Sequence, residues 1–172
     1  MTDSHEFESL LERHWGIVRK VAGVYARTPD AREDLAQEIC LQLWRSFDRY
    51  DRTRSFSTWM YRVALNTGIS YARRARLRST DEVPLQQVPA ASSAEPFDDR
   101  VDELYRFIHG QDELTRALVL LYLEDRPHKE IAEILGISET NVSTRLSRFR
   151  DLARRTLAET TSVEGDSEHE AR

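Results

Sequence analysis

Residues 128–146 read HKEIAEILGISETNVSTRL, and this stretch decides the fold of the carboxy-terminal part of the chain. Ala132 is small where two helices must approach closely, and Gly136, four residues later, can adopt the left-handed backbone of a tight turn. Ser138 is the expected N-cap of the second helix, and Val142 is expected on its buried face. The pattern is that of a helix-turn-helix unit, whose second helix enters the major groove of DNA.

The outward side of this second helix carries short polar groups and arginines, which suit base edges and phosphates. The candidate DNA contacts on the helix are Asn141, Ser143, Thr144, Arg145 and Arg148. Lys129, together with the backbone N–H groups that follow Ser138, is a candidate phosphate contact. A helical hairpin that uses the same glycine turn only for packing is the alternative, and the arginines favour DNA binding over it.

Charge is distributed unevenly along the 172 residues, whose formal net charge is −5. Residues 60–78 contain arginines and no acidic residue, and residues 141–155 contain arginines against the single acid Asp151. Two basic stripes in an acidic protein predict two local anion contacts with little general affinity for DNA. For either stripe alone, a solvated helix face would be the favoured interpretation.

Apolar periodicity predicts a chain that is nearly all helix. One helical stripe runs from Phe7 to Tyr25, and Thr28 is the expected N-cap of a second helix with Pro29 at its first position. The side chains expected to point inward from this second helix are Leu35, Ile39, Leu43, Trp44 and Phe47. Asn66-Thr67-Gly68 is expected to divide a third stretch into two helices, because glycine is costly inside a helix.

The composition of residues 79–96, with three prolines and little periodicity, predicts a flexible linker. The predicted fold is therefore all-α, with a helical domain at 4–78, a second at 97–158 and an acidic, disordered tail at 159–172. The absence of a signal segment, of a membrane-length apolar run and of any cysteine besides Cys40 predicts a cytoplasmic protein without membrane insertion. We find no catalytic constellation or metal-ligand spacing, so neither an enzyme nor a cofactor is expected.

Three stretches carry a family resemblance. Residues 34–45, DLAQEICLQLWR, followed by residues 56–66, FSTWMYRVALN, closely resemble sigma domain 2, and residues 114–150 resemble sigma domain 4. In order and spacing the chain is similar to the extracytoplasmic-function (ECF) subfamily of the bacterial sigma-70 family, over roughly residues 6–157. The resemblance implies a specificity subunit that binds core RNA polymerase and directs transcription initiation from the −35 and −10 promoter elements.

The resemblance also implies particular contacts. Asp34, Gln37 and Glu38 would bind the clamp coiled coil of the polymerase, and the carboxy-terminal domain would meet its flap. The −10 contacts would come from a turn that captures a flipped base and from the helix after it, at Asn66, Thr67, Ser70, Tyr71, Arg73 and Arg74. The helix after Ser138 would read the −35 element, with Ser138 itself among the predicted DNA contacts. An anti-sigma factor is a further partner that the family commonly has, and the holoenzyme would lie on the nucleoid.

Two other functions fit parts of the sequence. A helix-turn-helix regulator could bind operator DNA without polymerase, but it would need strong DNA affinity, usually from a dimer. The net acidic charge and the long linker argue against that reading. In the other alternative, a helical adaptor that binds no DNA, both arginine stripes would be incidental.

Overall fold

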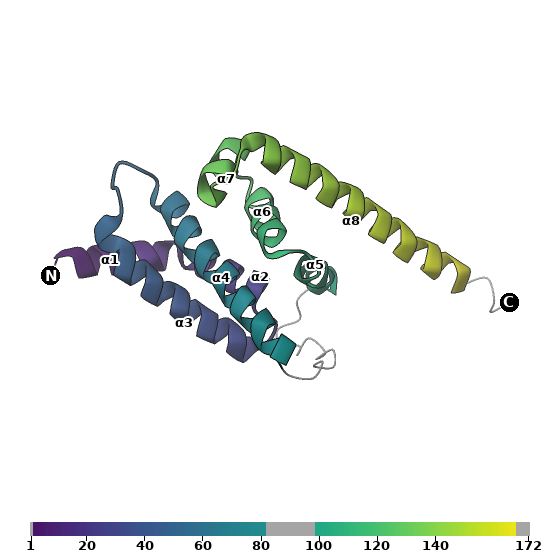
Figure 1. Ribbon diagram of the computed structural model, residues 1–172, viewed down its shortest axis with the longest axis horizontal. Coiled ribbons are helices and arrows are strands. Elements are labelled where there is room, and N and C mark those ends of the chain that lie inside the picture. The colour runs from purple at the N-terminus through teal and green to yellow at the C-terminus, as the bar shows by residue number, and fades with distance from the viewer. Residues whose placement is uncertain (1, 82–98, 168–172) are drawn as a thin grey trace.

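The computed structural model describes residues 2–81 and 99–167, which form helices and turns but no strand (Figure 1). The elements in chain order are α1 (Thr2–Arg13), α2 (Trp15–Tyr25), α3 (Pro29–Ser46), the short 3₁₀ helix η1 (Phe47–Arg49), α4 (Phe56–Asp81), α5 (Asp99–His109), α6 (Glu113–Leu123), α7 (His128–Leu135) and α8 (Glu139–Ser167). The predicted all-α fold is confirmed. We call α1–α4 the amino-terminal unit and α5–α8 the carboxy-terminal unit.

In the amino-terminal unit, α2, α3 and α4 pack against one another. Leu35, Ile39 and Leu43 of α3 are fully buried, as their spacing predicts. Thr28 caps α3 as expected, because its hydroxyl oxygen accepts a hydrogen bond from the N–H of Ala31 at 3.2 Å. These residues fix the direction in which α3 leaves the core.

The stripe from Phe7 to Tyr25 is divided between two helices, and the prediction of a single helix is wrong. The backbone leaves helical geometry at His14, with φ −111° and ψ 15°. Phe7 before the break and Val18 after it are both buried, so the apolar pattern continues across a change of direction. Periodicity reports which side chains are buried and does not detect such a break.

Helix α4 runs without interruption from Phe56 to Asp81, so the expected turn at residues 66–68 is wrong. Gly68 lies inside this helix and faces the ring of Tyr25 in α2. A Cβ atom at position 68 would lie 2.5 Å from Cδ2 of Tyr25, which is closer than any real contact. The glycine therefore permits two helices to approach and does not end one of them.

In the carboxy-terminal unit, Asp112 caps α6 by accepting hydrogen bonds from the N–H groups of Leu114 and Thr115. Helix α8 extends to Ser167, so the first part of the tail expected to be disordered is helical. It projects beyond the other helices (Figure 1). Residues 168–172 of that tail, and residues 82–96 of the predicted linker, lie outside the described residues.

The two units pack against each other. Helix α2 contacts α5 and α6, and α4 contacts α6 and α7. Buried side chains of both units form one hydrophobic cluster, which includes Val21 of α2 and Leu118 of α6. The sequence predicts separately tethered domains and gives no sign of this direct contact.

Among the helices that the structure describes, none combines the length and the apolar character needed to cross a membrane.

Candidate nucleic-acid interface

The helix-turn-helix unit is formed by α7, the turn at Gly136 and the first turns of α8. Gly136 adopts a left-handed conformation, with φ 67° and ψ 34°. A residue with a Cβ atom would be strained in this conformation. The side chain of Ser138 accepts a hydrogen bond from the N–H of Asn141 at 3.2 Å, as its predicted capping role requires. Val142 and Leu146 are completely buried, which turns the opposite side of α8 toward solvent.

This outer face of α8 carries most of the predicted −35 contacts. Asn141, Thr144 and Arg148 are exposed. Ser143 is exposed too, but its hydroxyl lies 3.2 Å from Nδ1 of His128 on α7. Lys129, the predicted phosphate contact of α7, is also exposed. The structure therefore leaves all of these side chains exposed to solvent.

Arg145 is held more firmly than its neighbours on α8. Its Nε donates to Oδ1 of Asn141 at 3.1 Å, and its Nη1 lies 3.6 Å from Oδ1 of Asp112, the N-cap of α6. The carboxylate and the amide restrict the orientation of the guanidinium group before DNA arrives. Such restriction suits a side chain that reads one base, because less conformational freedom is lost on binding.

The predicted −10 residues of α4 lie on more than one face of the helix. Asn66, Ser70 and Arg73 are exposed. Thr67 is buried, and its hydroxyl donates to the carbonyl of Val63 at 2.9 Å, so it faces the core. Tyr71 is half-buried. An exposed row therefore replaces the turn that the sequence predicts.

A hollow beside α4 was not predicted from the sequence. It has a volume of about 290 Å³, and its lining includes Tyr50, Trp59, Arg49, Arg54 and Arg62. The rings of Tyr50 and Trp59 lie 5.1 Å apart. Trp59 contacts the core cluster and also lines this hollow. The only signal in the sequence was the alternation of arginine with aromatic residues in the 49–62 segment.

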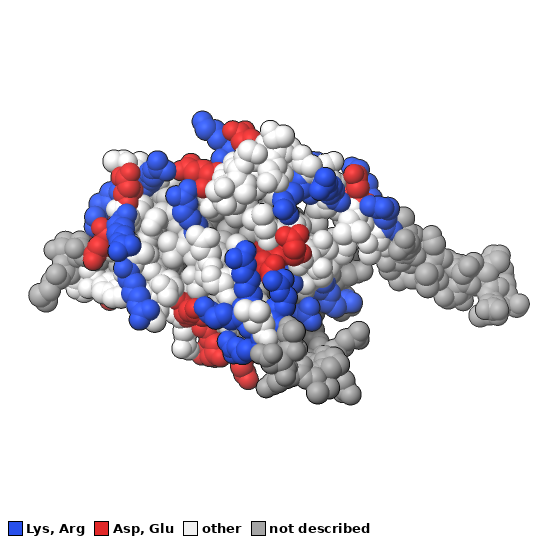
Figure 2. Space-filling model, viewed as in Figure 1, with Lys and Arg blue, Asp and Glu red and all other residues white. Residues whose placement is uncertain are grey.

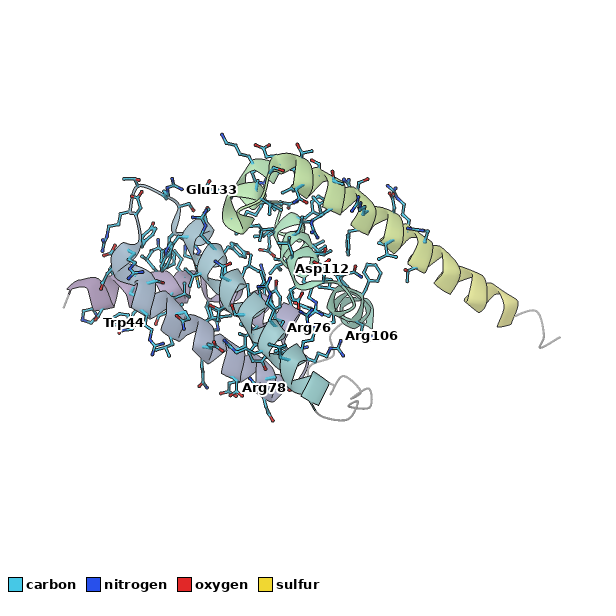
Figure 3. All side chains as sticks on the ribbon, in the orientation of Figure 1. Trp44, Arg76, Arg78, Arg106, Asp112 and Glu133 are labelled. Atoms are coloured by element: carbon cyan, nitrogen blue, oxygen red, sulfur yellow. The ribbon has the colours of Figure 1, made fainter. Side chains whose placement is uncertain are left out.

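The predicted polymerase-binding residues lie on the outward side of α3. Asp34 and Gln37 are exposed, and Glu38 is half-buried. Trp44 was expected to point inward, but 47% of its surface is exposed, while its ring also packs edge-on against Phe7 at 5.2 Å (Figure 3). Leu41 is 45% exposed, so α3 presents an apolar patch next to its polar one.

Burial shifts the pKa values of several titratable groups near these surfaces, Cys40 and Tyr61 among them. Burial raises the pKa of the Cys40 thiol, which keeps the thiol protonated and poorly nucleophilic. Burial, and then the nearby carboxylate of Glu124, raise the pKa of the Tyr61 hydroxyl. In the described part of the chain, no three His, Cys, Asp or Glu side chains are grouped as a metal site would need.

Comparison with known families agrees with this geometry. The model of sigma-70 region 2 matches residues 10–78, and the model of sigma-70 region 4 matches residues 112–151. The chain is 32% identical over 139 residues to the ECF RNA polymerase sigma factor SigW of Bacillus subtilis, covering 73% of this chain and 74% of that protein. It is 28% identical over 171 residues to the ECF RNA polymerase sigma-E factor of Haemophilus influenzae, covering 87% and 86% of the two chains.

Solved structures share the fold. The sigma factor RpoE, in complex with the anti-sigma factor NepR from Bartonella quintana, superposes with a TM-score of 0.71 at 19% identity, over 89% of this chain and 97% of that one. CnrH, in complex with the cytosolic domain of CnrY, gives a TM-score of 0.67 at 20% identity, over 91% and 90%. The family models, the relatives and the helix-turn-helix geometry lead to one conclusion: the chain belongs to the ECF group of the sigma-70 family of RNA polymerase sigma factors.

Proposed function

We propose that this sigma factor binds core RNA polymerase through α3 and reads promoters with α8 at the −35 element and with α4 at the −10 element. The main support for this proposal is that one chain contains sigma-70 region 2 followed by sigma-70 region 4, in the order that a promoter-directing subunit needs. A helix-turn-helix regulator without polymerase would need only the second of them.

For the polymerase contact, we propose that the clamp coiled coil packs on the outer face of α3. Asp34 and Gln37 would supply the polar contacts, and Leu41 and Trp44 would supply an apolar anchor beside them. Exposed aromatic side chains that become buried at the centre of an interface commonly dominate its binding energy. The flap would meet the carboxy-terminal unit.

For the −10 contact, the row on α4 continues toward the hollow that Tyr50 and Trp59 line. Arg62, Asn66 and Ser70 follow one another at four-residue spacing, which places them on one side of the helix. We propose that phosphates of the separated strand follow this row and that an extracted base stacks in the aromatic hollow. Aromatic stacking contributes about 1–3 kcal/mol per base and can offset the cost of unstacking.

The protein would act as a specificity subunit, with the chemistry of RNA synthesis left to the polymerase. We place it in the cytoplasm, on the nucleoid when it is part of the holoenzyme. An anti-sigma factor, as in the RpoE complex of Bartonella quintana, is proposed as its regulator. Affinity purification of the full chain from its own host would identify such a partner.

Transcription in vitro with core polymerase, followed by mapping of RNA start sites, tests the proposed function. We expect defined starts downstream of a shared pair of sequence elements. Asn66→Ala should impair open-complex formation more than polymerase binding, while Asp34→Ala should impair polymerase binding first. The proposal fails if the protein neither co-purifies with core polymerase nor produces any defined start.

A further inference from the structure

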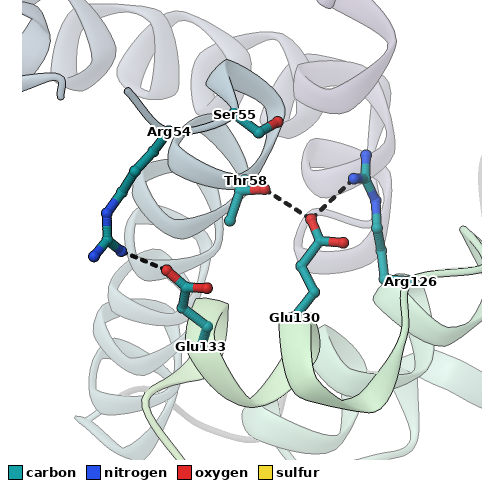
Figure 4. Close-up of a pocket in the computed structure, with 6 residues that line it drawn as sticks. All are labelled: Arg54, Ser55, Thr58, Arg126, Glu130 and Glu133. Atoms are coloured by element: carbon teal, nitrogen blue, oxygen red, sulfur yellow. Dashed lines mark hydrogen bonds and ion pairs between the residues drawn. The ribbon is translucent and has the colours of Figure 1, made fainter. Parts of the chain in front are cut away.

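Two hollows adjoin each other beside the amino-terminal end of α4. They share Arg54, Thr58 and Glu133 among their lining residues. The larger hollow has a volume of about 490 Å³ and is drawn in Figure 4. The smaller hollow, of about 290 Å³, is the one that Tyr50 and Trp59 line. The two differ in charge, and this difference decides which of them can bind an anion.

The charges of the larger hollow are balanced. Arg54 donates to the carboxylate of Glu133 at 2.5 Å (Figure 4). The carboxylate of Glu130 accepts from Arg126 at 3.0 Å and from the hydroxyl of Thr58 at 2.7 Å. Each arginine and each acid that lines this hollow therefore has a partner within it. An anion that entered the larger hollow would have to displace one of these carboxylates.

The smaller hollow has an excess of positive charge. Three arginines line it against two acids, Asp51 and Glu133. Arg54 serves both acids, because its Nε also lies 3.8 Å from Oδ2 of Asp51. The other oxygen of Asp51 accepts hydrogen bonds from the N–H and the hydroxyl of Thr53, at 2.9 and 2.7 Å. Both acids of the hollow are thus engaged without the remaining two arginines.

These two arginines, Arg49 and Arg62, are exposed and available to a ligand. Arg62 donates one hydrogen bond to the backbone carbonyl of Glu133, and neither arginine pairs with a carboxylate among the described residues. A guanidinium group has five N–H donors, so most of theirs remain free to bind a phosphate group. Figure 2 shows basic atoms gathered at the end of the molecule that α1, η1 and the loop of residues 50–55 form.

The aromatic wall of the same hollow is held in place by the core. The rings of Tyr50 and Trp59 each pack against the buried ring of Phe56, with centroids 5.4 and 5.3 Å away. The hydroxyl of Tyr50 also donates to the backbone carbonyl of Arg54 at 2.7 Å. A wall that is fixed before binding loses little conformational freedom when a flat ring stacks on it. Nucleobases of every kind stack on such aromatic side chains.

The cations stand next to the rings in the chain. Arg49 directly precedes Tyr50, and Arg62 follows Trp59 by three residues, which places both on one side of α4. From this combination we propose that the smaller hollow binds a free nucleoside monophosphate, with its base on Tyr50 and Trp59 and its phosphate on Arg49 and Arg62. A volume near the lower limit of ligand pockets, about 300 Å³, suits a single nucleotide.

The binding of a free nucleotide follows from the lining of the hollow and needs neither polymerase nor promoter. One consequence rests on the proposed function, which stacks the extracted −10 base on the same rings. A nucleotide bound in the hollow would occupy the place of that base. Free nucleotides would then oppose promoter opening by this sigma factor.

Quenching of Trp59 fluorescence tests the site in the full chain. Trp15→Phe and Trp44→Phe leave Trp59 as the single tryptophan, and both replaced side chains are about half exposed. We expect guanosine monophosphate (GMP) to quench the emission in a saturable way, because its base stacks on the indole. Circular dichroism of this variant reports whether its helices remain folded.

Fragments of the nucleotide separate its two contacts. Ribose 5-phosphate, measured by its ability to displace GMP, should bind about 5- to 150-fold more weakly than GMP, the factor that stacking of one base contributes. Guanosine, which lacks the phosphate, should bind about 2- to 25-fold more weakly than GMP, the factor expected from two exposed ionic contacts. Ribose 5-phosphate that binds as tightly as GMP would overturn the role of the rings.

Arginine variants locate the phosphate. Arg49→Gln combined with Arg62→Gln should make GMP bind no better than guanosine, while Arg49→Lys alone should keep most of the difference. Arg106→Gln is the matched control, since it removes an exposed arginine of α5 that lies outside the hollow (Figure 3). It should leave the binding of GMP unchanged. A preference for GMP over guanosine that survives the double substitution overturns the assignment of the phosphate.

The outcomes also distinguish the site from the proposed function. Defined transcription starts together with no quenching by GMP would overturn the nucleotide site alone. Saturable binding of GMP without any defined start would support the site and overturn the proposed function. Promoter opening by holoenzyme with the wild-type chain should fall as GMP is added. Equal opening at saturating GMP would overturn the competition with the extracted base.

Discussion

Arg74 of α4 donates two hydrogen bonds to the carboxylate of Glu38 on α3, at 2.7 and 2.8 Å. The pair joins two surfaces with different proposed partners, because Glu38 is predicted to face the polymerase and Arg74 is predicted to face the −10 element. Both side chains are partly exposed. Neither residue can contact its proposed partner fully without weakening this bond.

Arg74→Gln should therefore strengthen polymerase binding slightly, by up to about 5-fold, because it releases Glu38. The same change should weaken promoter opening, because it removes a phosphate contact. Titration of the labelled protein with core polymerase in the absence of DNA measures the first effect. Arg73→Gln, at the adjacent exposed position, is the control. Equal effects of the two substitutions on polymerase binding would contradict the coupling.

Arg145→Ala should relax specificity at one position of the −35 element, at a cost of about 1–3 kcal/mol for the preferred base. The hydrogen bond from Arg145 to Asn141 and the proximity of Asp112 pre-orient the guanidinium group toward one site. Arg148→Ala should weaken binding to all upstream sequences alike, and it should reduce the salt dependence of that binding. Transcription from promoters with single −35 substitutions separates the two patterns. Uniform weakening by Arg145→Ala would assign that side chain to a phosphate.

Gly68→Ala should destabilise the fold by about 1–3 kcal/mol, because its new methyl group would collide with the ring of Tyr25. Helix propensity alone predicts the opposite sign, a gain of about 1 kcal/mol. Gly16→Ala is the matched control, since nothing lies within 4 Å of a Cβ there. Urea unfolding of both variants gives the comparison. A stabilised Gly68→Ala protein would show that α2 and α4 can separate at low cost.

Local backbone chemistry made the helix-turn-helix predictable from sequence. The turn at Gly136, the cap at Ser138 and the buried Val142 each depend on a few neighbouring residues, and the structure has all three. The cap at Thr28 was predictable for the same reason. The burial of Leu35, Ile39 and Leu43 follows from their helical spacing, because apolar residues at that spacing lie on one face of a helix.

Features that depend on distant contacts were predicted wrongly or missed. Gly68 was taken for an interruption because its neighbour Tyr25 lies on another helix. Trp44 was predicted to lie in the core, but it is about half exposed and only part of its ring packs against Phe7. The pairing of Lys20 with Glu124 joins residues 104 positions apart, and no local pattern indicates it. The hollow beside Trp59 is lined by residues 49–54, by α4 and by α7, which are brought together only in the folded protein.

His109 gives the fold a dependence on pH. Its side chain is 8% exposed, and neither ring nitrogen has a hydrogen-bond partner among the described residues. Burial first, and then the positive charges of Arg116, Arg27 and Arg32, lower its pKa to about 4. The unfolded chain, with a histidine pKa near 6.5, binds the proton more readily, so stability is lost as the pH falls below about 6.5 toward 4.

We expect the free energy of unfolding to fall by about 2 kcal/mol between pH 7.5 and pH 5 on account of this residue. Urea unfolding at the two pH values measures the change. His109→Leu, which cannot take up the proton, should flatten the dependence even if it alters the stability at pH 7.5. His5→Gln, at an exposed position of α1, should leave the dependence as it is. A pH dependence that survives His109→Leu would mean that the pKa of His109 in the folded protein is close to that of the unfolded chain. Other groups would then cause the acid sensitivity.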